Sequence, residues 1–133
     1  FFVNRALSGE LLTVYKPGSQ ARNFVHVIDT ARVYVKSTER LLNQLDRGET
    51  GTETYEIAST EEMSVMTVGE IVREAASEEL GTEVDVELVD NPRADETMVT
   101  EFSVDISKAQ EVLSWEPVES VAECVRQSLT RDN

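Results

Sequence analysis

Residues 15–35, with the sequence YKPGSQARNFVHVIDTARVYV, contain the pattern that decides the fold. Pro17 and Gly18 predict a tight turn, because proline fixes φ and glycine accepts a positive φ. The alternating run at 24–27 predicts a short strand. Asp29 favours the start of a helix, whose apolar residues keep helical spacing through residue 45. The turn therefore presents Arg22 just before a strand and a helix, and Arg22 is the first candidate for binding an anion.

The rest of the chain continues this mixture of short strands and amphipathic helices. Thr67 and Glu70 form a capping box for a helix that Gly81 ends. The run at 84–89 alternates as a half-buried strand, with Val84, Val86 and Leu88 facing inward. Further expected elements are a helix end closed by Gly9, strands at 12–15 and 54–59, and helices at 105–113 and 120–130. This order predicts an α/β fold, with one small mixed sheet and packed helices, in a single domain over residues 1–133.

Acidic residues dominate the composition. There are 26 Asp and Glu against 12 Lys and Arg, a net charge of −14. Nucleic acids and anionic membranes are excluded as partners, because both require a positive surface. Such self-repulsion is relieved by salt, so the composition is typical of a salt-loving organism, with an ordinary acidic protein as the alternative. No apolar run is long enough to span a membrane, and we expect a cytoplasmic protein.

The sequence lacks the patterns of the common catalytic and cofactor sites. Its six glycines form no GxGxxG or GxxxxGK motif, and no tyrosine has a lysine four residues later. One histidine and one cysteine exclude a zinc site of nitrogen and sulfur ligands within one chain. His26 is expected to be a structural strand residue and Cys124 a buried apolar thiol. We therefore expect no catalytic residue, metal site or cofactor site in the chain by itself.

Two stretches resemble the C-terminal, substrate-binding region of the extended short-chain dehydrogenase/reductase family, which includes the NAD-dependent nucleotide-sugar epimerases and dehydratases. Residues 2–35, FVNRALSGELLTVYKPGSQARNFVHVIDTARVYV, are similar to the family run G-x-x-L-x-V-Y-G-D-G-x-Q-x-R-D-F-V-H-V-D-D-V-A. Residues 91–117, NPRADETMVTEFSVDISKAQEVLSWEP, are similar to P-R-x-G-D followed by D-x-S-K-A and L-G-W-x-P. The two motifs occur in the family's order and at its spacing.

This resemblance implies roles for individual residues. Arg22 and Arg93 would grip the diphosphate of a UDP- or dTDP-sugar, to which arginine offers bidentate hydrogen bonds. The segment containing Val14 and Tyr15 would border the base, largely through backbone groups. The remaining candidate substrate-binding residues are Phe24, beside Arg22 in the motif, and Asp95 or Glu96 as a contact to the ribose.

The resemblance also implies a longer parent enzyme, of which this chain is a fragment. A Rossmann domain outside the chain would bind NAD and carry the Tyr-x-x-x-Lys pair, and the enzyme would oxidise and re-reduce the sugar at C4. Whether it is an epimerase or a dehydratase is left open. Lys16-Pro17 departs from the usual Gly-Asp, and Asn23 stands where Asp is usual. The alternatives are arginines that simply pair with surface carboxylates, a stand-alone binding module, or a purely structural acidic domain.

Overall fold

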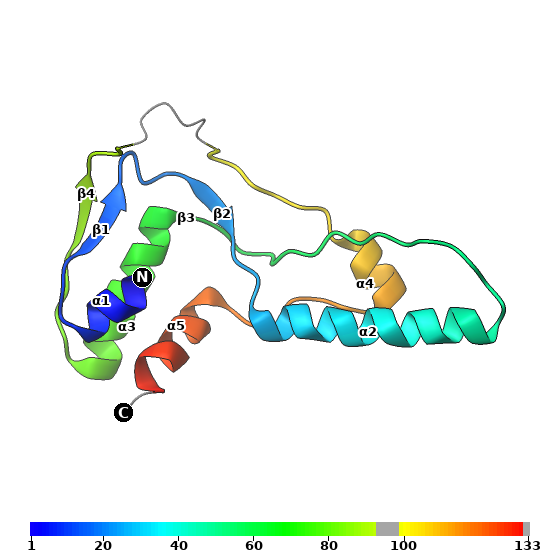
Figure 1. Ribbon diagram of the computed structural model, residues 1–133. Helices are drawn as coiled ribbons and strands as arrows, with labels where there is room; N and C mark the ends of the chain where they lie inside the picture. The colour runs from blue at the N-terminus through cyan, green and yellow to red at the C-terminus, as the bar shows by residue number, and fades with distance from the viewer. Residues whose placement is uncertain (93–98, 132–133) are drawn as a thin grey trace.

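The structure is a computed structural model that describes residues 1–92 and 99–131 (Figure 1). Helices and strands alternate irregularly along the chain. In order, they are α1 Phe2–Leu7, β1 Leu12–Tyr15, β2 Ala21–Asn23, α2 Val27–Asp46, β3 Glu62–Ser64, α3 Val65–Leu80, β4 Val86–Val89, α4 Ser107–Leu113 and α5 Val121–Thr130. This mixed order of helices and strands confirms the predicted α/β fold class.

The strands form two small sheets, so the prediction of one sheet is wrong for the described residues. β1 pairs in parallel with β4, with Leu12 opposite Val86 and Tyr15 opposite Val89. β2 pairs antiparallel with β3, with Ala21 opposite Ser64. The turn after β1 separates the two sheets, because it bends the chain away from β4 before β2 begins.

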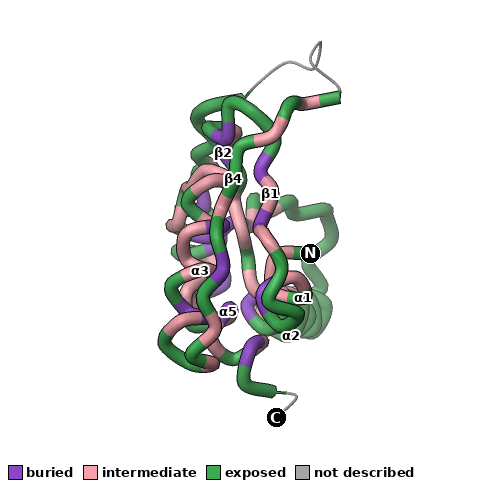
Figure 2. Tube along the Cα trace, turned by 90° about the vertical axis from the view of Figure 1, so that its left-hand side faces the viewer, coloured by how far each residue is buried: buried purple, intermediate pink, exposed green. Residues whose placement is uncertain are grey.

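Two separate apolar cores hold the structure together. The first lies between α1, α3, α5 and β1, where Leu12, Val72 and Leu129 are almost fully buried. The second surrounds Trp115 and includes Ala109 and Leu113, with α2 packed on α4. Figure 1 shows α2 extending away from the first core, and Figure 2 shows the buried parts of the trace concentrated outside α2.

The start of α2 differs from the expectation. Its N-cap is His26, whose Nδ1 accepts a hydrogen bond from the backbone N–H of Ile28 at 3.2 Å. Asp29, predicted to be the cap, instead lies fully buried in the first helical turn. Its carboxylate accepts hydrogen bonds from the backbone N–H groups of Val118 and Glu119, each at 3.1 Å. These distant partners take the carboxylate out of the capping role and bind the start of α2 to the segment before α5.

The predicted strands at 24–27 and 54–59 are also wrong as elements. The observed strand is β2, three residues earlier, and the chain has turned into α2 by Val27. Residues 54–59 are not assigned to a strand, and no backbone–backbone hydrogen bond joins residues 54–58 to another described residue. Tyr55 and Ile57 pack against the core around Trp115. This segment thus keeps its predicted inward face but lacks a neighbouring strand.

The later elements agree more closely. α3 begins one turn before the predicted capping box, because the hydroxyl of Ser64 accepts the N–H of Thr67 at 3.0 Å. Gly81 ends α3 in the left-handed region, with φ 63°, as predicted. In the strand predicted at 84–89, Val84 is buried, whereas Leu88 is 39% exposed. Cys124 is half-buried, so the expectation of a buried thiol is only partly met.

Candidate functional site

The turn between β1 and β2 positions the candidate site. The Lys16–Pro17 peptide bond is cis, and Gly18 has φ +79°. The N–H of Gly18 donates to the carbonyl of Tyr15 at 2.9 Å. A Cβ at Gly18 would lie 2.9 Å from Cδ2 of Leu88, so the turn requires glycine both for its backbone conformation and for space.

The start of α3 holds this turn in place. The N–H of Met66 donates to the carbonyl of Gly18, and the N–H of Val65 donates to that of Gln20, both at 3.1 Å. Backbone donors that are free at a helix start are therefore used to fix the turn. Because the turn is fixed, the direction in which β2 leaves it is fixed as well.

Arg22 lies exposed in the middle of β2. Its Nη1 donates to the backbone carbonyl of Ala21 at 2.8 Å. It makes no ion pair with any residue in the described ranges. A guanidinium has five N–H donors, so most of the hydrogen-bonding capacity of Arg22 is available to a ligand. Within residues 1–92 and 99–131, the alternative of an Arg22–carboxylate pair is not observed.

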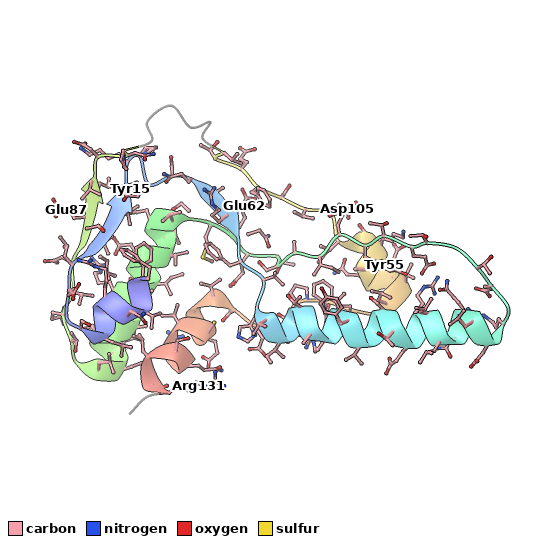
Figure 3. The ribbon with its side chains drawn as sticks, in the orientation of Figure 1. Tyr15, Tyr55, Glu62, Glu87, Asp105 and Arg131 are labelled. Atoms are coloured by element: carbon pink, nitrogen blue, oxygen red, sulfur yellow. The ribbon has the colours of Figure 1, made fainter. Side chains whose placement is uncertain are left out.

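Tyr15 and Val14 lie at the end of β1. The side chain of Tyr15 is 46% exposed, and Figure 3 shows it at the tip of the strand. Val14 is buried, so only its backbone could border a ligand. Lys16, the next residue, forms an ion pair with Asp90 at 2.9 Å. The hydrogen bond and the charge of Asp90 raise the pKa of Lys16, so this cation lies beside Tyr15 with its charge balanced.

Phe24 borders a different part of the surface from Tyr15 and Arg22. It is half-buried and lines a hollow of about 490 Å³, together with His26, Val121 and Cys124. Neither Tyr15 nor Arg22 lines this hollow. The predicted contact of Phe24 with the ligand of Arg22 stays a prediction.

Arg93, Asp95 and Glu96 lie outside the described residues, and the convergence of Arg22 and Arg93 stays a prediction. The described residues on either side of them contact the candidate site. The carbonyl of Val89 accepts the N–H of Lys16, and the carbonyl of Val99 accepts the N–H of Ala21, each at 2.8 Å. Val89 thus lies beside the start of the turn, and Val99 lies beside its end.

Sequence reasoning missed the role of Asn23. Its side-chain amide donates to the carbonyl of Ser59 at 2.9 Å, and its Oδ1 accepts the N–H of Ser59 at 2.8 Å. An aspartate, the usual residue in the resembling motif, could accept but not donate here. The sequence shows asparagine in place of aspartate at position 23, but it does not reveal that Asn23 pairs with Ser59, thirty-six residues later. The paired amide fixes the end of β2, next to Arg22.

The described residues offer little for other kinds of site. They contain no group of three or more His, Cys, Asp and Glu side chains arranged to hold a metal ion. Among them, no helix combines the length and apolar character needed to cross a bilayer. Among the described residues, the exposed guanidinium of Arg22 beside the turn is therefore the main group that could bind a ligand.

No family model matches the chain. It is 34% identical over 116 residues to UDP-glucuronic acid decarboxylase 6 of Arabidopsis thaliana, covering 87% of the chain and 29% of that protein. It is 30% identical over 116 residues to the low-salt glycan biosynthesis protein Agl12 of Haloferax volcanii, covering 87% of the chain and 33% of that protein. The chain thus spans about a third of the length of these curated relatives. The predicted resemblance to the extended short-chain dehydrogenase/reductase family is confirmed.

Solved structures of UDP-sugar 4-epimerases show the same fold. The UDP-N-acetylglucosamine 4-epimerase of Bacillus cereus matches with a TM-score of 0.70 and 20% identity, over 99% of this chain and 39% of that one. The UDP-glucose 4-epimerase of Thermotoga maritima, solved with UDP-glucose, matches with a TM-score of 0.63 and 22% identity, over 96% and 36%. The fold shared with these epimerases therefore covers nearly the whole chain.

Proposed function

We propose that the chain is the nucleotide-sugar-binding part of an NAD-dependent enzyme that acts on a nucleoside-diphosphate sugar. In this proposal Arg22 binds the diphosphate. The observation that carries it is the exposed guanidinium of Arg22, free of carboxylate partners among the described residues. Some of the relatives are named UDP-glucuronic acid decarboxylases and several structural neighbours are UDP-sugar 4-epimerases, and these names support the substrate class.

Electrostatics makes Arg22 decisive for this role. A chain with net charge −14 repels a diphosphate at long range, so binding requires a local positive group. Lys16 lies in the adjacent turn but is paired with Asp90. A guanidinium remains charged at all relevant pH values and matches phosphate oxygens bidentately. Arg93, the second arginine of the proposal, would share the diphosphate with Arg22.

The described residues do not fit a dinucleotide cofactor. Their glycines form none of the closely spaced motifs that let a backbone approach a pyrophosphate. We propose that NAD binds to a part of the enzyme outside these 133 residues, and that this chain contributes no catalytic group. Its task is to hold the substrate so that the sugar faces the cofactor. Epimerisation, dehydration and decarboxylation are the reaction classes consistent with the relatives and the resemblance.

Calorimetric titration with UDP and with uridine tests the role of Arg22. The protein from the complete reading frame is compared with its Arg22→Gln and Arg47→Gln variants. Loss of one arginine–phosphate contact costs about 2–4 kcal/mol, or roughly 30- to 1000-fold in Kd. Arg47 is the matched control, because it is exposed at the end of α2 and pairs with Glu49 at 2.7 Å. We expect Arg22→Gln to weaken UDP binding and to leave uridine binding unchanged.

Two results contradict the proposal. One is equal UDP affinity in the wild type and in Arg22→Gln. The other is a wild-type protein that binds neither UDP nor UDP-sugars at millimolar ligand, which favours the structural acidic domain. A protein that binds UDP-sugars but does not convert them with NAD supports the alternative of a stand-alone binding module.

A further inference from the structure

The two strands of the parallel sheet end next to each other, and a charged residue follows each of them. Tyr15, the last residue of β1, lies opposite Val89, the last residue of β4. Figure 1 shows both arrows pointing to the same end of the sheet. Lys16 follows β1, and Asp90 follows β4. Open α/β sheets bind ligands outside the carboxyl ends of their strands, so Lys16 and Asp90 lie where a ligand of this sheet is expected.

Lys16 and Asp90 pair with each other at the surface. Nζ of Lys16 lies 2.9 Å from Oδ1 of Asp90, and the two side chains are 57% and 93% exposed. Ion pairs as exposed as this one contribute little to stability, because water solvates both charges well. Neither side chain has a second hydrogen-bond partner among the described residues. A ligand anion can therefore displace Asp90 from the ammonium at little cost to the fold.

The backbone around Lys16 is held in place, whereas its side chain is adaptable. The N–H of Lys16 donates to the carbonyl of Val89 at 2.8 Å, and the bond from Gly18 to Tyr15 closes the turn that follows. Lysine has three N–H donors on a flexible four-carbon stem. One donor is bonded to Asp90, so two remain for a ligand. The ammonium can thus turn from Asp90 to a ligand while the turn itself stays in place.

The turn places Lys16 between the two parts of the candidate site. Tyr15, exposed at the end of β1, precedes it, and Arg22, exposed in β2, follows the turn. In the proposed function these residues border the base and bind the diphosphate, so the nucleotide has to pass over the turn that joins them. Lys16 stands where the family motif has glycine. This chain therefore has a cation at a place that the motif leaves without a side chain.

We propose that Lys16 is a second cation for the phosphates of the nucleotide sugar, and that Asp90 competes with this ligand for the ammonium. The inference rests on the proposed function, because it concerns the same ligand as Arg22. In the free protein, Asp90 holds the ammonium at the ends of the two strands. A diphosphate carries more negative charge and more acceptor oxygens than one carboxylate, so the bound ligand takes the ammonium from Asp90. The carboxylate of Asp90 thus lowers the affinity of the site for its ligand.

This competition predicts opposite effects for the two partners of the ion pair. Lys16→Met removes the cation and should weaken UDP binding by roughly 5- to 10-fold. Asp90→Asn releases the ammonium and should tighten UDP binding by roughly 3- to 5-fold. A pair that only held the turn in place would behave differently, because the loss of either side chain would loosen the turn and weaken binding.

Calorimetric titration with UDP, and with uridine as the ligand that lacks phosphate, tests these signs on the protein from the complete reading frame. Lys16→Met, Asp90→Asn and the double variant form a cycle that isolates the interaction between the two side chains. In the Lys16→Met background, Asp90→Asn should change the Kd for UDP by less than about 2-fold. Lys16→Arg keeps the positive charge and should bind UDP within about 3-fold of the wild type.

Two variants on α2 control for the change of net charge. Lys36→Met and Asp46→Asn change the charge of the chain by the same amounts as the variants at the turn. Lys36 lines a small hollow beside α4, and Asp46 is exposed at the end of α2. At physiological salt, charges farther away than about 8 Å are largely screened. Both controls should therefore leave the Kd for UDP within about 2-fold of the wild-type value.

The signs of the effects decide between the outcomes. Weaker UDP binding in Lys16→Met, tighter binding in Asp90→Asn and unchanged uridine binding in both support the inference. Unchanged or weaker UDP binding in Asp90→Asn, or unchanged binding in Lys16→Met, overturns it. A gain of affinity in Asp90→Asn cannot arise from misfolding, so the test remains valid if Lys16→Met misfolds.

Failure of the inference can be told apart from failure of the proposed function. UDP binding that is weakened by Arg22→Gln but not by Lys16→Met overturns the inference alone. UDP binding that is weakened by Lys16→Met but not by Arg22→Gln contradicts the role proposed for Arg22 and supports the one inferred for Lys16. A wild-type protein that binds neither UDP nor UDP-sugars overturns both.

Discussion

Removing the carboxylate of Asp29 should destabilise the whole protein. Asp29 is fully buried, and its Oδ2 accepts the N–H groups of Val118 and Glu119, each at 3.1 Å. Its Oδ1 lies 2.8 Å from Nη2 of Arg32 in an ion pair. Asp29→Ala leaves two backbone donors without their acceptor and removes the anionic partner of Arg32, whose Nη2 still donates to the carbonyl of Glu116 at 2.6 Å. A buried donor that loses its acceptor costs about 1–3 kcal/mol.

The expected cost can be bounded from the exposure of the partners. Val118 is 59% exposed, so water can replace part of the lost bonding and each N–H contributes near the lower limit. With the loss of the ion pair, we expect a decrease of about 3 kcal/mol in the free energy of unfolding. Domains are stable by roughly 5–15 kcal/mol, so the variant should still fold. Asp29→Asn retains an acceptor oxygen and should lose about half as much.

Urea denaturation at fixed KCl concentration, followed by the fluorescence of Trp115, measures these differences. The control is Asp46→Ala, at the exposed C-terminal end of α2, which should change the stability by less than about 0.5 kcal/mol. The reasoning is refuted if Asp29→Ala is as stable as Asp46→Ala. It is also refuted if Asp29→Asn is the less stable of the two Asp29 variants.

Three further predictions follow from the charge and the backbone. Raising KCl from 0.1 to 1 M shortens the Debye length from about 10 Å to about 3 Å and so screens the repulsion within this chain of net charge −14. Calorimetry should therefore show the Tm rising by about 5 °C. An unchanged or lower Tm contradicts this prediction. In urea denaturation, Gly18→Ala should lower the free energy of unfolding by about 2–4 kcal/mol, because the new Cβ approaches Leu88. Gly48 also has a positive φ, of +70°, but open space around it, so Gly48→Ala should cost only about 1 kcal/mol. Equal costs for the two variants would exclude the steric contribution. The hydrogen bond from Arg40 lowers the pKa of Glu53 from 4.5 to about 2. This contact therefore stabilises the fold above pH 4.5 and is lost as the pH falls to 2, so the Tm difference between wild type and Glu53→Gln should shrink over that range; a constant difference would contradict the assignment.

Local sequence signals predicted the helices better than the strands. Ser120 before α5 and Gly81 after α3 act within one turn of the backbone, and these two helix ends lie where they were expected. Residues 54–59 show why the strands were harder to predict. Their alternation correctly indicates an inward face, but a strand also requires a partner, which their own sequence does not encode.

The candidate site was predictable in part. Arg22 is predicted from the turn that precedes it and from the family motif; the structure shows it exposed, and its binding role stays a prediction. The role of Asp29 was misjudged and that of Asn23 was missed, because their hydrogen-bond partners lie 36 to 90 residues away in the chain. A carboxylate just before a helical pattern commonly indicates an N-cap, but here the carboxylate of Asp29 bonds to distant backbone groups instead. Local chemistry thus selects the residue, while tertiary contacts decide its role.

The bridge between α2 and the segment before α5 has a consequence for synthesis of the protein. The carboxylate of Asp29 meets a backbone group ninety residues later. At about 5–20 residues per second, the ribosome delivers that partner roughly 5–20 s after the helix has left it. During this interval the carboxylate of Asp29 has Arg32 as a nearby partner but lacks its two backbone donors. The start of α2 therefore gains its full set of hydrogen bonds only after the segment before α5 has been made.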